Sequence, residues 1–186
     1  GYYNKKNIKL NELSKSTAAH NSLTIDDHSS CKFKKIKNSF LLDKGLKILN
    51  RQAIFEKDYW KIKCSHDGYQ KKYNSIHERE IEFFPKQMIF SGLDKIVKKK
   101  INHNYKFDIR FHLEPNVKLM KTQDNKSILI DLGEEGWKFT CENFDLNIDN
   151  GLYFGNKNSY TDNQNIFITG ISNNQIENIR WKLEKV

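Results

Sequence analysis

Short runs of alternating apolar and polar residues recur along almost the whole chain. Alternation of this kind, rich in β-branched and aromatic residues, is typical of strands that bury one face. No segment sustains a helical period, and only Ile8–Ser16 is expected to form a turn or two of helix. The predicted strands are Leu23–Asp26, Tyr59–Cys64, Ile76–Phe84, Phe107–Leu113, Val117–Met120, Ser127–Leu132, Trp137–Cys141, Ile166–Thr169 and Ile179–Leu183.

Turn-forming residues separate these runs. Each turn supplies a residue that tolerates positive φ or a side chain that hydrogen-bonds its own backbone. The predicted turns are Asp67-Gly68, Asp124-Asn125, Gly133–Gly136, Asn150-Gly151 and Ser172–Asn174. About a dozen strands joined by hairpins predict an all-β fold, an antiparallel β-sandwich of two sheets.

The chain shows no linker, repeat or low-complexity tract, so one domain over residues 1–186 is expected. A break near Phe90–Asn104 is the alternative, because Lys98–Lys100 is a run of charge; we interpret that run as a solvated loop. The sequence opens at Gly1 rather than at a methionine, which favours a fragment truncated at its N-terminus. No stretch approaches the length of a membrane-spanning helix, so no membrane partner is expected.

The three cysteines, Cys31, Cys64 and Cys141, are odd in number and far apart. They lack a CxxC pair, so buried free thiols are expected rather than a zinc knuckle or a disulfide framework.

Positive charge is concentrated in the first half of the chain. Residues 1–100 contain 22 Lys and Arg against 11 Asp and Glu, whereas residues 101–186 contain 10 against 12. Such a half can attract nucleic acid or an acidic glycan. Only four of the 32 basic residues are arginine, the residue that reads phosphates and base edges bidentately, so nucleic acid is not the expected partner. Lysines on solvated strand faces are the simpler interpretation.

The most informative segment is Ser16–Leu23, STAAHNSL, where His20 sits among small residues just before a predicted strand. Ala18 and Ala19 permit close approach of backbone or ligand, and Asn21 adds an amide. By chemistry alone, His20 can be a metal ligand, a general base or a buried structural histidine.

Together with later motifs, this segment resembles the heparinase II/III-like polysaccharide lyases. STAAHNSL is similar to the family's R-S-T-A-A-H-N-T-L segment, with Lys15 in place of the arginine. CSHDGYQKKYNSIHER (Cys64–Arg79) is similar to its A-S-H-D-G-Y…H-x-R stretch. Weaker matches follow in the family's order, so the resemblance runs from about residue 14 to the C-terminus: IRFHLEPNV (Ile109–Val117), GEEGWKF (Gly133–Phe139) and IRWKLE (Ile179–Glu184). Asp27 replaces the usual glycine, which weakens inference beyond Asp26.

The resemblance implies a β-sandwich that in the family is joined to an N-terminal α/α toroid, here absent. It implies β-elimination on polysaccharides that contain uronic acid, such as glycosaminoglycans or alginate. A base removes the C5 proton beside a neutralised carboxylate, and an acid protonates the departing oxygen. In the family these roles fall to a tyrosine and histidines, and the tyrosine and the neutralising group lie in the toroid. The isolated chain is therefore expected to be inactive.

His20 matches the histidine of the family's A-H-N motif. In the family this residue helps to bind zinc at the domain junction or lies at the catalytic cleft. The other ligands and an H-x-H-A-D motif would precede Gly1. Zinc is therefore expected in the full-length protein and not in this chain. The resemblance also implies a periplasmic or secreted location.

The SHDGY stretch has two interpretations. The stretch can form a polar cluster that contacts an acidic sugar, made of His66, Asp67, Tyr69, His77 and Arg79. Asn21 is a further candidate for binding the substrate. Alternatively, Asp67-Gly68 is a tight turn, and His77 and Arg79 share one face of the next strand because they are two residues apart.

Two other functions stay open at this point. The sandwich can be a non-catalytic glycan-binding or structural module, or it can bind nucleic acid through its basic half. The nucleic-acid hypothesis lacks a recognition helix, an arginine cluster or an RNP-like aromatic pattern.

Overall fold

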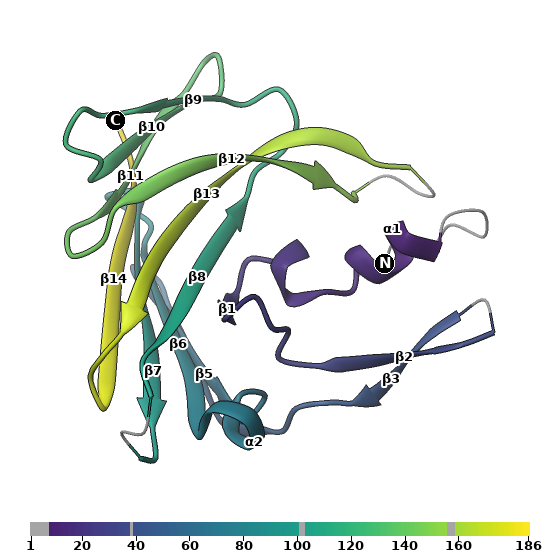
Figure 1. The fold of residues 1–186 in the computed structure, drawn as a ribbon. Helices are drawn as coiled ribbons and strands as arrows, with labels where there is room; N and C mark the ends of the chain where they lie inside the picture. Colours follow the sequence, from purple (N-terminus) through teal and green to yellow (C-terminus); the bar gives the residue numbers. More distant parts are fainter. Residues whose placement is uncertain (1–7, 38, 101–102, 156–158) are drawn as a thin grey trace.

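The computed structural model describes residues 8–37, 39–100, 103–155 and 159–186, and most of these residues lie in antiparallel strands (Figure 1). The larger sheet has eight strands, in the order β4 (Ile48–Glu56), β5 (Tyr59–His66), β6 (Ser75–Phe84), β7 (Ile89–Lys98), β14 (Ile176–Lys185), β11 (Gly136–Cys141), β10 (Ser127–Asp131) and β9 (Lys118–Lys121). The smaller sheet has four, in the order β1 (Leu23–Ile25), β8 (Tyr105–His112), β13 (Thr161–Ser172) and β12 (Leu146–Tyr153).

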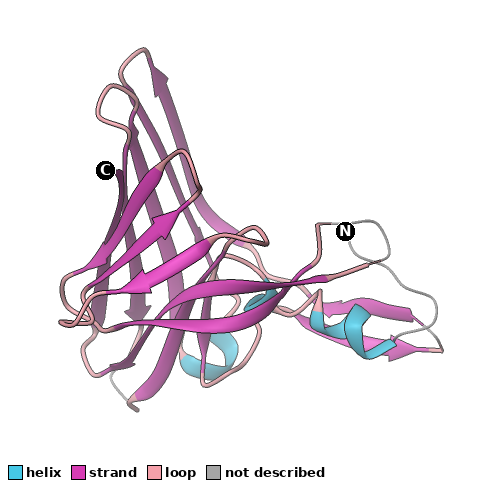
Figure 2. Ribbon diagram, turned by 90° about the horizontal axis from the view of Figure 1, so that it is seen from above, coloured by secondary structure: helices cyan, strands magenta, loops and turns pink. Residues whose placement is uncertain are grey.

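A third, two-stranded sheet lies outside the sandwich. It is the hairpin of β2 (Lys32–Ile36) and β3 (Ser39–Lys44), and it projects from the sandwich beside helix α1 (Ile8–Leu13) (Figures 1 and 2). Two further short helices are η1 (Thr17–Ala19), just before β1, and α2 (Gln70–Tyr73), between β5 and β6. None of the helices formed by the described residues is long and apolar enough to cross a membrane.

The main core lies between the two larger sheets. Phe107 and Ile109 of β8 and Ile166 of β13 are fully buried and belong to one cluster with Ile96 of β7 and Ile179 of β14. Alternation along each strand directs these side chains inward and leaves the intervening positions outside. The predicted antiparallel β-sandwich is therefore confirmed.

Pairing across the larger sheet aligns a row of aromatic side chains on the face that turns toward the core. Phe55 pairs with Trp60, Trp60 with Phe83 and Phe83 with Phe90. At its far end the row reaches Phe139, which is buried. At its near end the smaller sheet no longer covers it, and Phe55 and Trp60 are 65% and 44% exposed.

Three expectations are wrong in whole or in part. Of the run Lys98–Lys100, expected to be a solvated loop, Lys99 and Lys100 are exposed beyond the end of β7, but Lys98 is the last residue of that strand and is only 1% exposed. Asn150-Gly151 is not a turn but lies inside β12, where a side chain on Gly151 would meet the Asn165 amide. Of the three free thiols, only Cys141 is buried, while Cys31 and Cys64 are half-buried.

The short helix expected within Ile8–Ser16 is present as α1. The strands β2, β3, β4, β7 and β12 were not among the predicted runs.

Candidate functional site

His20 lies on a short loop between η1 and β1, and its side chain is exposed. The loop backbone is fixed around it. The His20 N–H donates to the Thr17 carbonyl at 3.1 Å, and the Ser22 N–H donates to the His20 carbonyl at 2.7 Å. The imidazole therefore projects into solvent from a defined backbone.

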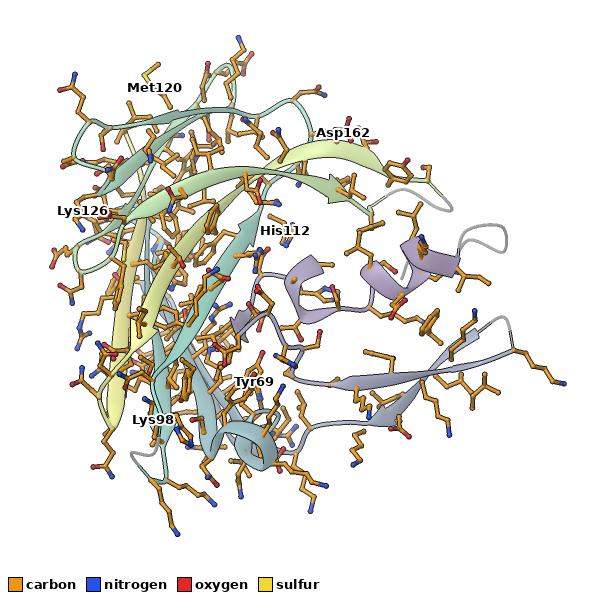
Figure 3. The ribbon with its side chains drawn as sticks, viewed as in Figure 1. Tyr69, Lys98, His112, Met120, Lys126 and Asp162 are labelled. Carbon is orange, nitrogen blue, oxygen red and sulfur yellow. The ribbon has the colours of Figure 1, made fainter. Side chains whose placement is uncertain are left out.

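His112, near the end of β8, holds this loop from the side of the smaller sheet (Figure 3). Its ring Nε2–H donates to the Ala18 carbonyl at 2.9 Å, and its backbone N–H donates to Asn21 Oδ1 at 2.7 Å. Burial lowers the pKa of His112, so the neutral ring is favoured. The Asn21 side chain is thus occupied in holding the loop, although the residue is exposed.

Arg79 of β6 holds the same loop from the larger sheet. Its Nη1 donates to the Asn21 carbonyl, while Nε and Nη2 donate to the two oxygens of Asp94 at 2.7 and 3.1 Å. This is the bidentate geometry in which a guanidinium binds a carboxylate most strongly. One side chain therefore links the larger sheet to the residue after His20.

Asp94 is the central anion of the cluster and is fully buried on β7. Besides Arg79, it accepts a hydrogen bond from His77 Nε2 at 2.6 Å and one from Trp181 Nε1 at 2.9 Å. Burial would raise the pKa of Asp94, but the Arg79 charge and the His77 hydrogen bond outweigh it and lower that pKa below its ordinary value. Asp94 is therefore ionised, as a buried carboxylate with this many donors should be.

The hydrogen bonds assign the protons along a chain of two histidines. The Gly68 N–H donates to His66 Nδ1 at 3.2 Å, so His66 carries its proton on Nε2. That Nε2 lies 3.2 Å from His77 Nδ1 and donates to it, which leaves His77 to donate from Nε2 to Asp94. Burial, aided by the neighbouring His77, lowers the pKa of His66 from 6.5 to about 4.

Tyr69 and the Asp67-Gly68 pair have packing roles. Tyr69 is 1% exposed, and its hydroxyl donates to the Leu23 carbonyl of β1. Asp67 and Gly68 lie in a turn, as expected, but the turn continues into α2 before β6 begins. A side chain on Gly68 would come within 2.7 Å of the Ser30 carbonyl oxygen.

The six residues predicted from the sequence therefore divide into three groups. His20 and Asn21 are exposed on the loop, and Arg79 is half-buried beneath it. His66 and His77 belong to the hydrogen-bond chain behind Arg79, and Tyr69 lies in the core. His77 and Arg79 do share one face of their strand, because both contact Asp94.

The sequence analysis did not identify Asp94, Trp181 or His112 as residues that support the site. The sequence does contain a pattern that indicates an inward position for Asp94. Phe90, Gly92, Asp94 and Ile96 recur at every second position, as residues on one face of a strand do. A carboxylate in that inward register requires partners from other strands.

An open cavity of about 930 Å³ lies between the β2–β3 hairpin and α2. Its lining includes four lysines, none of which forms an ion pair with any other described residue: Lys32, Lys44, Lys71 and Lys72. Tyr73 and Phe33 add aromatic surface to the same cavity.

A model of the family described as "Heparinase II/III-like, C-terminal" matches residues 1–182. The chain therefore belongs to this family, which confirms the resemblance drawn from its motifs. A search of curated proteins gave no match.

Solved structures share the fold at low sequence identity. Heparan sulfate lyase HepC from Pedobacter heparinus has a TM-score of 0.76 and 12% identity, over 98% of this chain and 26% of that one. The heparinase III BT4657 gene product gives 0.69 and 13%, over 96% and 26%, and a further heparinase III gives 0.67 and 15%, over 97% and 25%. This chain thus spans about a quarter of the length of these structures.

Proposed function

We propose that this chain is the β-sandwich part of a polysaccharide lyase that cleaves uronic-acid-containing polysaccharides by β-elimination. Membership of the heparinase II/III-like C-terminal family makes it the C-terminal domain of a polysaccharide lyase. The observation that carries the proposal is the exposed imidazole of His20 on a loop held from both sheets. An exposed histidine on a fixed backbone can transfer a proton to or from a bound sugar at near-neutral pH.

β-Elimination needs a base for the C5 proton, neutralisation of the adjacent carboxylate and an acid for the leaving oxygen. His20 supplies one proton-transfer group in this proposal. The remaining groups come from polypeptide outside this chain, as the length of the related structures suggests. The chain alone is accordingly expected to be inactive, and a periplasmic or secreted location would give the enzyme access to its polymer.

An acidic substrate is supported by the charge of the chain. The net charge is +9, and the four lysines of the hairpin cavity form no ion pair with another described residue, although Lys72 Nζ is hydrogen-bonded to His28 Nε2. Arg79 supports substrate binding less directly than the sequence suggested, because its donors already serve Asp94 and Asn21. Tyr69 and His77, at 1% and 4% exposed, fit support of the loop better than contact with sugar.

Zinc requires a separate test. Among the described residues, no three His, Cys, Asp or Glu side chains lie together as a metal site would require. The described residues therefore do not make a zinc site by themselves. A zinc ion at His20 would need its other ligands from elsewhere in the enzyme.

The test is to produce the longest natural form of the protein and follow the ultraviolet absorbance of unsaturated uronate on heparan-like, alginate-like and other acidic polysaccharides. His20→Ala should lower kcat by about 100-fold or more, the usual loss for a proton-transfer residue. His103→Ala is the matched control, since His103 is exposed on the loop after β7. If wild-type protein binds these glycans without cleaving any of them, the non-catalytic glycan-binding module replaces the lyase.

A further inference from the structure

Arg79 is the only described side chain that joins the buried anion of the larger sheet directly to the His20 loop. Two of its nitrogens hold Asp94 and a third donates to the Asn21 carbonyl. The guanidinium is planar and its donors are fixed relative to one another. The position of the Asp94 carboxylate therefore sets the position of the Asn21 carbonyl, one residue from His20.

Asp94 itself has little freedom to move. It is 0% exposed and is held by His77 at 2.6 Å and by Trp181 at 2.9 Å in addition to Arg79. Trp181 reaches it by lying flat over Gly92, where even a Cβ atom would come within 2.0 Å of the indole. The carboxylate, on β7, is thus fixed by groups from the two neighbouring strands β6 and β14.

The guanidinium is fixed by packing as well. It lies over the ring of Phe111 at 5.8 Å, and Phe111 packs edge-on against Trp181 at 4.9 Å between ring centroids. A cation held over an aromatic face and paired with a buried carboxylate samples few orientations. The Asn21 carbonyl consequently meets a donor whose direction is set by the sandwich core.

We propose that Asp94 and Arg79 are positioning residues for His20. They hold the loop carbonyl so that the imidazole projects from the loop in one direction, while neither residue touches substrate. This inference rests on the proposed role of His20 in proton transfer. A displacement of about 1 Å at a proton-transfer group can cost up to about 100-fold in rate without weakening substrate binding.

The experiment compares Arg79→Lys and Asp94→Asn in the longest natural form of the protein, with histidines labelled with ¹³C. Lysine keeps the charge but cannot hold two carboxylate oxygens and a carbonyl at once. Each variant should lower kcat about ten-fold or more, change KM less than about two-fold, and shift or broaden the His20 ring resonance. The resonance is assigned from its loss in His20→Gln.

Glu80→Gln is the matched control. Glu80 lies one residue from Arg79 on the opposite face of β6 and pairs with Lys61 at 2.8 Å. Its replacement should change neither kcat nor the His20 resonance. Arg79→Lys decides the matter alone if Asp94→Asn reduces the folded fraction seen by circular dichroism.

The outcomes separate this inference from the proposed function. A folded Arg79→Lys variant with wild-type kcat and an unmoved His20 resonance overturns the positioning role. A moved resonance in a protein whose wild type cleaves no acidic polysaccharide refutes the lyase function and leaves the positioning of His20 supported. A fall in kcat/KM that arises from a raised KM alone, with kcat unchanged, also counts against positioning.

Discussion

Acidification should destabilise this fold through His66. Burial and the neighbouring His77 lower the pKa of His66 from 6.5 to about 4. Both ring nitrogens are in use, because Nδ1 accepts from the Gly68 N–H and Nε2 donates to His77. A second proton on Nδ1 would set two N–H groups against each other, so the folded protein resists protonation where the unfolded chain does not.

The sign and the size of the pH effect on stability follow from the difference between the pKa of His66 in the folded chain and in the unfolded chain. The unfolded chain takes up the proton as the pH falls through 6.5, whereas the folded chain takes it up only near 4. The stabilising contribution is therefore fully present above 6.5 and is lost as the pH falls toward 4. Between about pH 7.5 and about pH 5, the free energy of unfolding should fall by about 2 kcal/mol on account of this residue.

The assay is urea denaturation at these two pH values for wild type and His66→Gln. Glutamine keeps an N–H that can donate to His77 but does not titrate. Wild type should lose about 2 kcal/mol more than His66→Gln. Contributions from His112, whose pKa is also lowered by burial, are present in both proteins and cancel in the difference.

A second variant, His103→Gln, removes an exposed histidine and should lose as much stability as wild type. The reasoning is refuted if wild type and His66→Gln lose equal amounts, because the acid sensitivity would then arise elsewhere in the molecule.

Three further predictions concern stability at about pH 7.5, each measured by urea denaturation. Gly92→Ala should cost about 3 kcal/mol and change the near-ultraviolet circular dichroism, because the new methyl group would displace the Trp181 indole from Asp94; an unchanged spectrum would contradict this. Tyr69→Phe should cost about 1 to 2 kcal/mol through the lost hydrogen bond inside the core, and should leave lyase activity of the longer protein intact. Lys98→Glu should cost about 3 kcal/mol or more, because Lys98 Nζ donates to two backbone carbonyls that would repel a carboxylate; a loss below about 1 kcal/mol would show that the buried ammonium is dispensable.

Strands with one apolar face could be predicted from the sequence, and β7 could not. Period-two alternation located β5, β6 and β8, because charged residues recur at every second, outward position of each strand. In β7 the residues Asp94 and Lys98 look like surface residues, yet both are buried. Their partners come from distant segments, as with the Ser172 carbonyl that accepts from Lys98 at 2.7 Å.

The hairpin β2–β3 escaped prediction for the opposite reason. Most of its described side chains are exposed, so no alternation marks it. Asn150-Gly151 was mistaken for a turn because the dipeptide is a strong turn signal. In β12 the glycine is instead required by the close approach of Asn165 from β13.

For the site, motifs identified the loop of His20 and the strand of Arg79 but not how they are joined. Arg79 itself donates to the loop, and its orientation is set by Asp94 and Trp181, which lie outside both motifs in the sequence. Such a link arises from strand order, since β6, β7 and β14 are neighbours only in the folded sheet. No local pattern encodes it.

The unequal width of the two main sheets has a practical consequence. Phe55, Trp60 and Ile62 lie side by side on paired strands at 65%, 44% and 49% exposed. Apolar surface left bare in this way favours self-association of the isolated chain, through this face or with the projecting hairpin. Melting temperatures of the chain on its own should therefore rise with protein concentration, since any contact that covers this face is linked to folding by mass action.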